Sequence, residues 1–144
     1  MKKKTLRKEK IKTKITNIID SVNFVGDELP SNVEEFVGSR LIKNALYKQI
    51  EFAIENIIDI CSIMNSDLEL GIPEDDETTI DHLERDNVLS RKVCNKIREI
   101  KRFRNILIHK YGDIDDKKAY DSIKEGLSDF EPIIEEFEKI LEKY

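Results

Sequence analysis

The chain has 144 residues, of which 38% are charged, and a formal net charge of −5. This length suits a single domain, residues 1–144, around one hydrophobic core, and five glycines and three prolines are too few for an all-β fold with many tight turns. No apolar run approaches the roughly 20 residues that a membrane span needs, and no apolar stretch follows the basic N-terminus as in a signal peptide. We therefore expect a cytoplasmic protein without membrane contact, in which Cys61 and Cys94 are reduced and buried.

The first part of the chain predicts two helices joined by a short turn. Apolar residues recur at helical spacing from about Thr5 to Gly26, and Pro30 ends this pattern. Residues 31–34, Ser-Asn-Val-Glu, have the form of a capping box that starts a short helical turn. Ser39 is then suited to cap a long helix that reaches about Asn65.

The long helix carries apolar residues on more than one side. One set shares a face and comprises Ile42, Leu46, Ile50, Ala53, Ile57, Ile60, Cys61 and Met64. A second set comprises Leu41, Phe52, Ile54 and Ile58. Burial on two sides is expected for the central helix of a bundle or for a helix at a dimer interface.

After the long helix, the pattern predicts a loop and a short helix. Residues 71–77 include glycine, proline and an acidic run, which indicates a loop. A short helix follows from Thr78 or Thr79 to Arg85, and Ser90 can cap the helix after it.

The helix that begins after Ser90 ends at Tyr111, because Gly112 suits the left-handed conformation that closes helices. Asp115 or Asp116 then starts a last helix, which we expect to kink or break near Asp129. The elements together predict an all-α fold, an antiparallel helical bundle of four main helices with one or two short ones.

Charge is distributed unevenly along the chain. Residues 88–111 contain eight Lys or Arg and one acid, as do the first fourteen residues, whereas residues 112–144 contain eleven acids and five bases. A basic segment can hold a phosphate backbone even when the global charge is negative. The same residues can instead form a solvated helix face that pairs with the acidic C-terminal helix, and the sequence leaves both interpretations open.

Reactive side chains gather at the end of the basic helix. Arg104, Asn105, His109 and Tyr111 lie within eight residues. At about 100° per residue, Arg104 falls on the apolar stripe formed by Val93, Ile97, Ile100, Phe103, Leu107 and Ile108. A charge in that position must be paired or must line a cavity. Arg104 and His109 are about 140° apart on an ideal helix, so they converge only if the arginine reaches around, the last turn loosens, or a second chain completes the cleft.

This set of side chains could cleave RNA without a metal ion. His109 titrates in the range needed to take a proton from a ribose 2′-OH, and Arg104 stays charged and binds phosphate oxygens. Asn105 could orient either group, and Tyr111 could contact phosphate, stack on a base or accept a modification. Each side chain also has an ordinary alternative role: a histidine near a helix C-terminus, an arginine paired with a carboxylate, and a tyrosine that plugs the core.

Residues 103–111, Phe-Arg-Asn-Ile-Leu-Ile-His-Lys-Tyr, resemble the signature of the HEPN superfamily, and specifically of the HepT-type toxins. The pattern is an arginine, four residues, a histidine, one residue and a tyrosine. The resemblance extends to residues 53–60 and 112–115, and it covers about residues 5–141.

The resemblance implies a HEPN-like helical homodimer whose active cleft forms between subunits. Arg104 and His109 would be the catalytic pair of an endoribonuclease toxin, with Asn105 as the polar residue after the arginine. Tyr111 would be adenylylated by a partner antitoxin, a minimal nucleotidyltransferase of the MNT type, in a toxin–antitoxin system with RNA as the toxin's substrate. The alternative function is a non-catalytic helical subunit that binds a nucleotidyltransferase and presents substrate to it.

Two further features of the sequence bear on the site. Glu51, Glu55 and Asp59 form an acidic ridge on the long helix. This ridge is either a solvated or salt-bridged face, or Asp59 or Glu55 supports the site by pairing with Arg104 or by orienting the active cleft. Neither a metal site nor a cofactor is expected, and the histidines and cysteines lack the spacing of metal ligands. No glycine-rich phosphate loop occurs, so this chain is not expected to be the nucleotidyltransferase itself.

Overall fold

The computed structural model describes residues 4–109 and 113–144, and these residues contain helices and irregular segments but no strand. In chain order the elements are α1 (Lys8–Glu28), α2 (Val33–Gly38), α3 (Arg40–Asp67), α4 (Asp76–Arg85), α5 (Arg91–His109), α6 (Asp116–Gly126), the 3-10 helix η1 (Leu127–Asp129) and α7 (Phe130–Lys143). The prediction of an all-α fold is confirmed.

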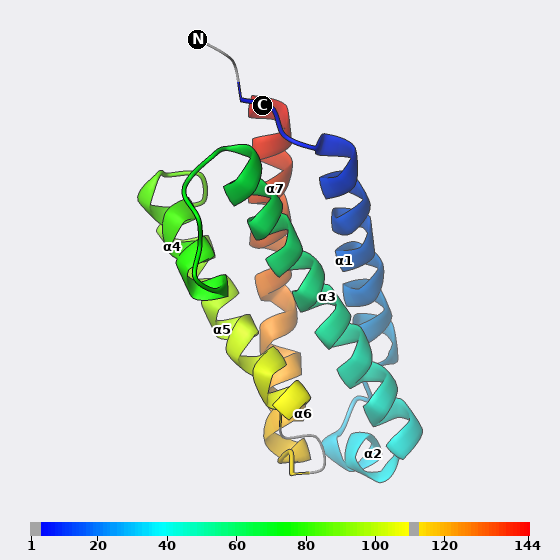
Figure 1. Cartoon of the computed structure of the whole chain (residues 1–144). Coiled ribbons are helices and arrows are strands. Elements are labelled where there is room, and N and C mark those ends of the chain that lie inside the picture. Colours follow the sequence, from blue (N-terminus) through cyan, green and yellow to red (C-terminus); the bar gives the residue numbers. More distant parts are fainter. Residues whose placement is uncertain (1–3, 110–112) are drawn as a thin grey trace.

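Four long columns run side by side in the bundle: α1, α3, α5 and the α6–α7 pair (Figure 1). The central column is α3, which contacts α1, α2, α4 and α5, while α7 contacts α1 and α5 behind it. The short helices α2 and α4 lie at the periphery, with α4 packed against α3 and α5. This arrangement matches the predicted bundle of four main helices and two short ones.

The core takes residues from every long helix, including Ile18, Ile57, Ile97 and Ile133, none of which is exposed. Burial of such side chains is the main stabilising contribution to a helical bundle.

The second apolar set of α3 divides into two pairs. Ile54 and Ile58 are buried, but Leu41 is 81% exposed and Phe52 is 38% exposed. The central position of α3 therefore explains only part of its apolar surface.

Three of the predicted helix caps are confirmed. Ser39 accepts a hydrogen bond from the backbone N–H of Ile42 (3.2 Å), and Ser90 accepts one from Val93 (3.2 Å). Asp115 caps α6. Each oxygen satisfies an N–H that has no partner within the first turn of its helix.

Two predicted starts are wrong by one to three residues. α2 is capped by Asn32 rather than Ser31, because Asn32 has the extended backbone and accepts from Glu35 N at 2.9 Å. α4 begins at Asp76 rather than at Thr78 or Thr79, because Asp75 accepts from Thr78 N at 2.8 Å. The acidic run that suggests a loop instead favours a helix N-terminus, where carboxylates meet unpaired N–H groups and the positive end of the helix dipole.

The expected break near Asp129 is confirmed, since η1 separates α6 from α7. Pro132 lies in the first turn of α7, where a backbone N–H is not needed. Cys61 and Cys94 are both buried free thiols, as predicted, and burial raises the pKa of Cys94 to about 12. Among the residues described, no helix is both long enough and apolar enough for a transmembrane segment.

Candidate active site at the end of α5

The apolar stripe of α5 faces the core over most of its length. Val93, Ile97, Ile100 and Leu107 are buried, and Phe103 is partly buried against the same core. Ile108 is 41% exposed, so its assignment to the core stripe is wrong. It lies about 100° around the helix from Leu107, which occupies the core position of that turn.

Arg104 lies on the core side of α5, as the helical spacing predicts, and its side chain is only 16% exposed. Its Nη2 donates a hydrogen bond to Asn105 Oδ1 (3.1 Å) and lies 3.6 Å from Asp76 Oδ2. Arg104 Nε is buried and has no hydrogen-bond partner among the described residues. The guanidinium is thus held by one neutral hydrogen bond and one long ion pair, which leaves donor capacity for an anion.

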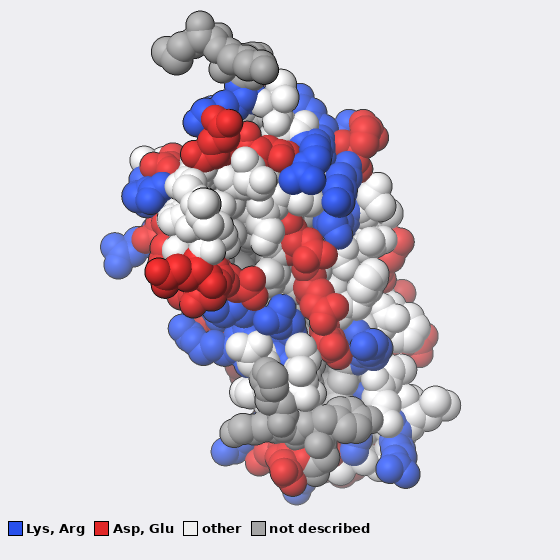
Figure 2. Space-filling model, viewed as in Figure 1, with Lys and Arg blue, Asp and Glu red and all other residues white. Residues whose placement is uncertain are grey.

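The acid beside Arg104 comes from α4 and not from the acidic ridge of α3. Asp59 pairs with Lys14 on α1 (3.0 Å), and Glu55 is exposed. Acidic side chains follow α3 along the face shown in Figure 2. The ridge is therefore a solvated and salt-bridged face, and the expectation that Asp59 or Glu55 pairs with Arg104 is replaced by Asp76.

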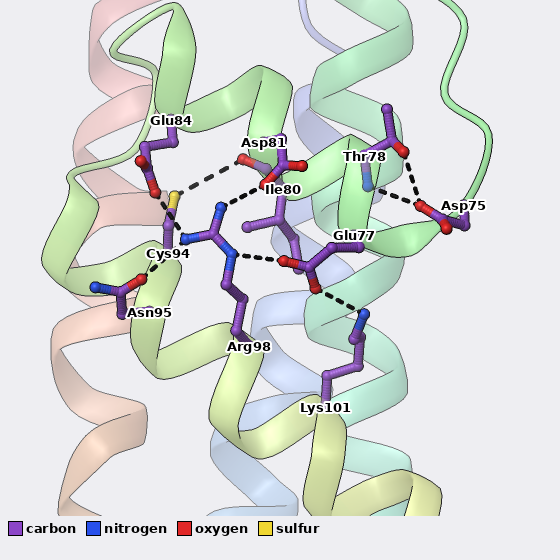
Figure 3. Close-up of polar contacts among 10 residues, drawn as sticks. All are labelled: Asp75, Glu77, Thr78, Ile80, Asp81, Glu84, Cys94, Asn95, Arg98 and Lys101. Atoms are coloured by element: carbon purple, nitrogen blue, oxygen red, sulfur yellow. Dashed lines mark hydrogen bonds and ion pairs between the residues drawn. The ribbon is translucent and has the colours of Figure 1, made fainter.

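Closer to the start of α5, carboxylates of α4 form short ion pairs with two basic side chains (Figure 3). Arg98 contacts Glu77 (2.8 Å), Asp81 (2.7 Å) and Glu84 (2.7 Å), and Lys101 contacts Glu77 (3.0 Å). Burial opposes the charge of Arg98, but hydrogen bonds to the three carboxylates outweigh it and raise the pKa of Arg98. The hydrogen bond from Lys101, followed by that from Arg98, holds the pKa of Glu77 below its ordinary value.

These pairs bear on the interpretation that the basic residues of α5 form a solvated face paired with the acidic C-terminal helix. Arg98 and Lys101 pair with α4, while Lys96 contacts Asp129 in the C-terminal region (2.7 Å). In Figure 2 the acidic side chains at the start of α4 lie directly beside the basic side chains of α5. The basic helix is therefore partly neutralised by a segment that precedes it in the chain.

The start of α6, which follows the motif, is anchored to α3. Asp116 accepts hydrogen bonds from Lys43 Nζ (2.8 Å) and from the Tyr47 hydroxyl (2.7 Å). Burial works against the ionised carboxyl, yet the bonds from Lys43 and Tyr47 hold the pKa of Asp116 below its usual value. Burial and the bond to Asp116 raise the pKa of Tyr47.

The remaining motif residues are only partly described. The backbone of His109 ends α5, but its side chain lies outside the described residues, as do Tyr111 and Gly112. Asn105 is half-buried beside Arg104. The structure thus brings Arg104, Asn105 and Asp76 together and describes no contact of the His109 or Tyr111 side chains.

Residues 11–137 match the family described as Ribonuclease HepT-like. The chain belongs to this family. It is 22% identical over 138 residues to a putative RNase of Archaeoglobus fulgidus, a match that covers 96% of this chain and 98% of the relative. It is also 22% identical over 94 residues to the mRNA nuclease HepT of Shewanella oneidensis, covering 65% of this chain and 71% of that one.

The fold of this HepT-like chain is that of a solved HEPN toxin. The tri-AMPylated Shewanella oneidensis HEPN toxin, solved in complex with an MNT antitoxin, superposes with a TM-score of 0.81 at 20% identity, covering 90% of this chain and 97% of that one. The predicted family and fold are thereby confirmed.

Asp76 is the residue near this site that the sequence did not single out. The signal was present, since Asp76 belongs to the acidic run at the start of α4. Residues 74–77 contain four acids in a row, however, and only the packing of α4 on α5 decides which of them meets Arg104.

Proposed function

We propose that this chain is the toxin of a toxin–antitoxin system and a metal-independent endoribonuclease, with Arg104 and His109 as its catalytic pair in the cleft of a homodimer. The observation that carries the proposal is Arg104 itself. It is a largely buried cation on the core side of α5, with a buried Nε that no described residue engages. Membership of the ribonuclease HepT-like family and the RNase names of the relatives support the reaction type.

In the proposed reaction, the His109 imidazole takes the proton of a ribose 2′-OH. The 2′-oxygen then attacks the adjacent phosphorus, and the bond to the 5′-oxygen breaks. The products are a 2′,3′-cyclic phosphate and a 5′-hydroxyl. The 5′-oxygen takes its proton from the His109 imidazolium formed in the first step. Arg104 stabilises the negative charge that develops on the phosphorane oxygens, and Asn105 orients the guanidinium through the 3.1 Å hydrogen bond.

A second copy of the chain is part of the proposal. Leu41 and Phe52 on α3 and Ile106 and Ile108 on α5 are between 38% and 81% exposed. Exposed apolar side chains that gather into one patch are typical of protein interfaces, and we propose that a second copy of the chain covers these four. A partner subunit that covers them would also supply the second wall that the separation of Arg104 and His109 around α5 requires.

We propose that the partner antitoxin is an MNT-type nucleotidyltransferase that modifies Tyr111. The Tyr111 phenol oxygen would bond to the α-phosphorus of ATP, and pyrophosphate would leave. The Shewanella toxin of the same fold is tri-AMPylated and bound to an MNT antitoxin, which supports this class of partner. A phosphate placed two residues after His109 would repel an RNA phosphate from the cleft.

The test of the catalytic proposal compares wild type, Arg104→Ala and His109→Ala on single-stranded RNA in the presence of EDTA. Wild type is expected to cleave, and each variant to lose at least about 100-fold in rate. Equal rates in all three proteins would overturn the proposal. Tight binding of a nucleotidyltransferase without any cleavage would favour the non-catalytic helical subunit instead.

The modification has a separate test. The chain is co-expressed with an MNT-type nucleotidyltransferase, and its intact mass is measured beside that of Tyr111→Phe. Increments of one or more AMP groups are expected only in wild type. Their absence from wild type, or their persistence in Tyr111→Phe, would show that Tyr111 is not the acceptor.

A further inference from the structure

One side of α5 carries a line of polar residues that leads to the proposed active site. Arg91, Asn95, Arg98, Arg102 and Asn105 follow one another at intervals of three or four residues. Arg91, Asn95 and Arg102 are exposed, and Arg98 and Asn105 are partly buried. Residues at this spacing are neighbours on a helix surface. The next step of the same spacing reaches backbone position 109, the last residue of α5.

The cations on this line differ in what already binds them. Arg98 is engaged by three carboxylates of α4 and its side chain is only 15% exposed. Lys101, beside the line, is held by Glu77 and is 14% exposed. Arg102 is exposed, and no described carboxylate forms an ion pair with it. The basic segment thus retains an unneutralised guanidinium within one turn of Asn105.

We infer that Arg102 binds an RNA phosphate that flanks the scissile one, and so positions the strand along α5; this inference rests on the proposed ribonuclease function. At 1.5 Å per residue, Arg102 lies about 4.5 Å along the helix axis from Asn105 and about 10 Å from position 109. A strand entering the site along this side passes α4, where Arg98 and Lys101 pair with Glu77, Asp81 and Glu84 and so reduce the repulsion between these carboxylates and RNA phosphates.

Arg102 would contact a phosphate other than the scissile one. This position determines which kinetic constant, KM or kcat, changes when the side chain is removed. A contact with a flanking phosphate is made equally in the ground state and in the transition state. Losing it raises KM and leaves kcat unchanged, because uniform binding does not lower the barrier of the bound substrate. Removal of one charge-assisted contact is expected to raise KM about tenfold.

The experiment compares Arg102→Ala with Arg91→Ala in the full-length protein, using one single-stranded RNA oligonucleotide. Arg91 is the matched control, because it is an exposed arginine on the same line, about 16 Å further from the site. Binding of the same oligonucleotide is measured from 50 to 300 mM salt in the His109→Ala background, where cleavage cannot interfere. Arg102→Ala is expected to flatten the slope of log K against log salt by about 0.7, the value for one phosphate contact on a single strand.

The inference is overturned if Arg102→Ala matches Arg91→Ala in KM and in salt slope, or if the His109→Ala protein binds no RNA. It is also overturned if Arg102→Ala lowers kcat with KM unchanged, since that result puts Arg102 at the scissile group. If the proposed ribonuclease function itself is wrong, a different result is expected. Wild type then cleaves no faster than Arg104→Ala, while the salt slopes still report whether Arg102 contacts RNA.

Discussion

Two arginines of α5, Arg98 near the middle of the helix and Arg104 closer to its end, have different partners. Arg98 has three carboxylates at 2.7 to 2.8 Å. Arg104, less than two turns later, has a single carboxylate at 3.6 Å and a buried Nε without a described partner. Both side chains are about 15% exposed. The two arginines are therefore similarly buried but differently paired. Arg98 binds three carboxylates of α4, whereas Arg104 has one long ion pair and a buried Nε without a described hydrogen-bond partner.

The largest effect expected from this contrast is on the rate of cleavage. Arg104→Lys keeps the charge but loses the planar fork, and it should lower kcat for RNA cleavage about 100-fold with little change in stability. The matched replacement Arg98→Lys should leave kcat within about twofold, and should lower the free energy of unfolding by about 2 kcal/mol because two of its carboxylates lose their partner. The measurements are steady-state cleavage and urea unfolding of both variants. An equal loss of rate in both variants would remove the distinction between Arg98 and Arg104.

A smaller effect is expected at the carboxylate beside Arg104. Asp76→Asn removes the ion pair at 3.6 Å but leaves the hydrogen bond to Asn105, so the guanidinium is less well oriented and kcat should fall about three- to tenfold. The control is Asp81→Asn on the same helix, which removes one of the three carboxylates of Arg98. Cleavage kinetics that are the same for the two variants would show that Asp76 does not orient Arg104.

The smallest effect concerns stability at the start of α6. Asp116 accepts short hydrogen bonds from Lys43 and Tyr47, so it is fully paired, as Arg98 is. Because its pKa is lower in the folded chain than in the unfolded chain, its stabilisation is complete above the unfolded pKa of about 3.9 and is lost as pH falls through the folded value. Asp116→Asn should lower the free energy of unfolding by about 1 kcal/mol at pH 7.

Urea unfolding of wild type and Asp116→Asn at pH 7, 5 and 3 tests this dependence. The difference should be the same at pH 7 and 5 and smaller at pH 3. A difference that grows as the pH falls would contradict the assignment of Asp116 as an ionised, hydrogen-bonded anchor of α6.

Local rules account for most of the fold. Ser39, Ser90 and Asp115 start their helices as predicted, because an oxygen at that position satisfies backbone N–H groups whatever the rest of the chain does. The starts of α2 and α4 were misplaced for a local reason as well. In both regions two or more adjacent residues can serve as caps, and the sequence does not rank them.

The sequence by itself determined the helical periodicity, the core stripes and the conflict of placing Arg104 on one of them, because these follow from 3.6 residues per turn and the cost of burying charge. Only the tertiary structure decided which carboxylate meets which cation. Asp76 lies beside Arg104, Asp59 pairs with Lys14, and Arg98 is neutralised while Arg102 is left exposed. Those pairings join segments far apart in the chain, so they depend on how α4 and α1 pack against α5 and α3, which no local pattern encodes.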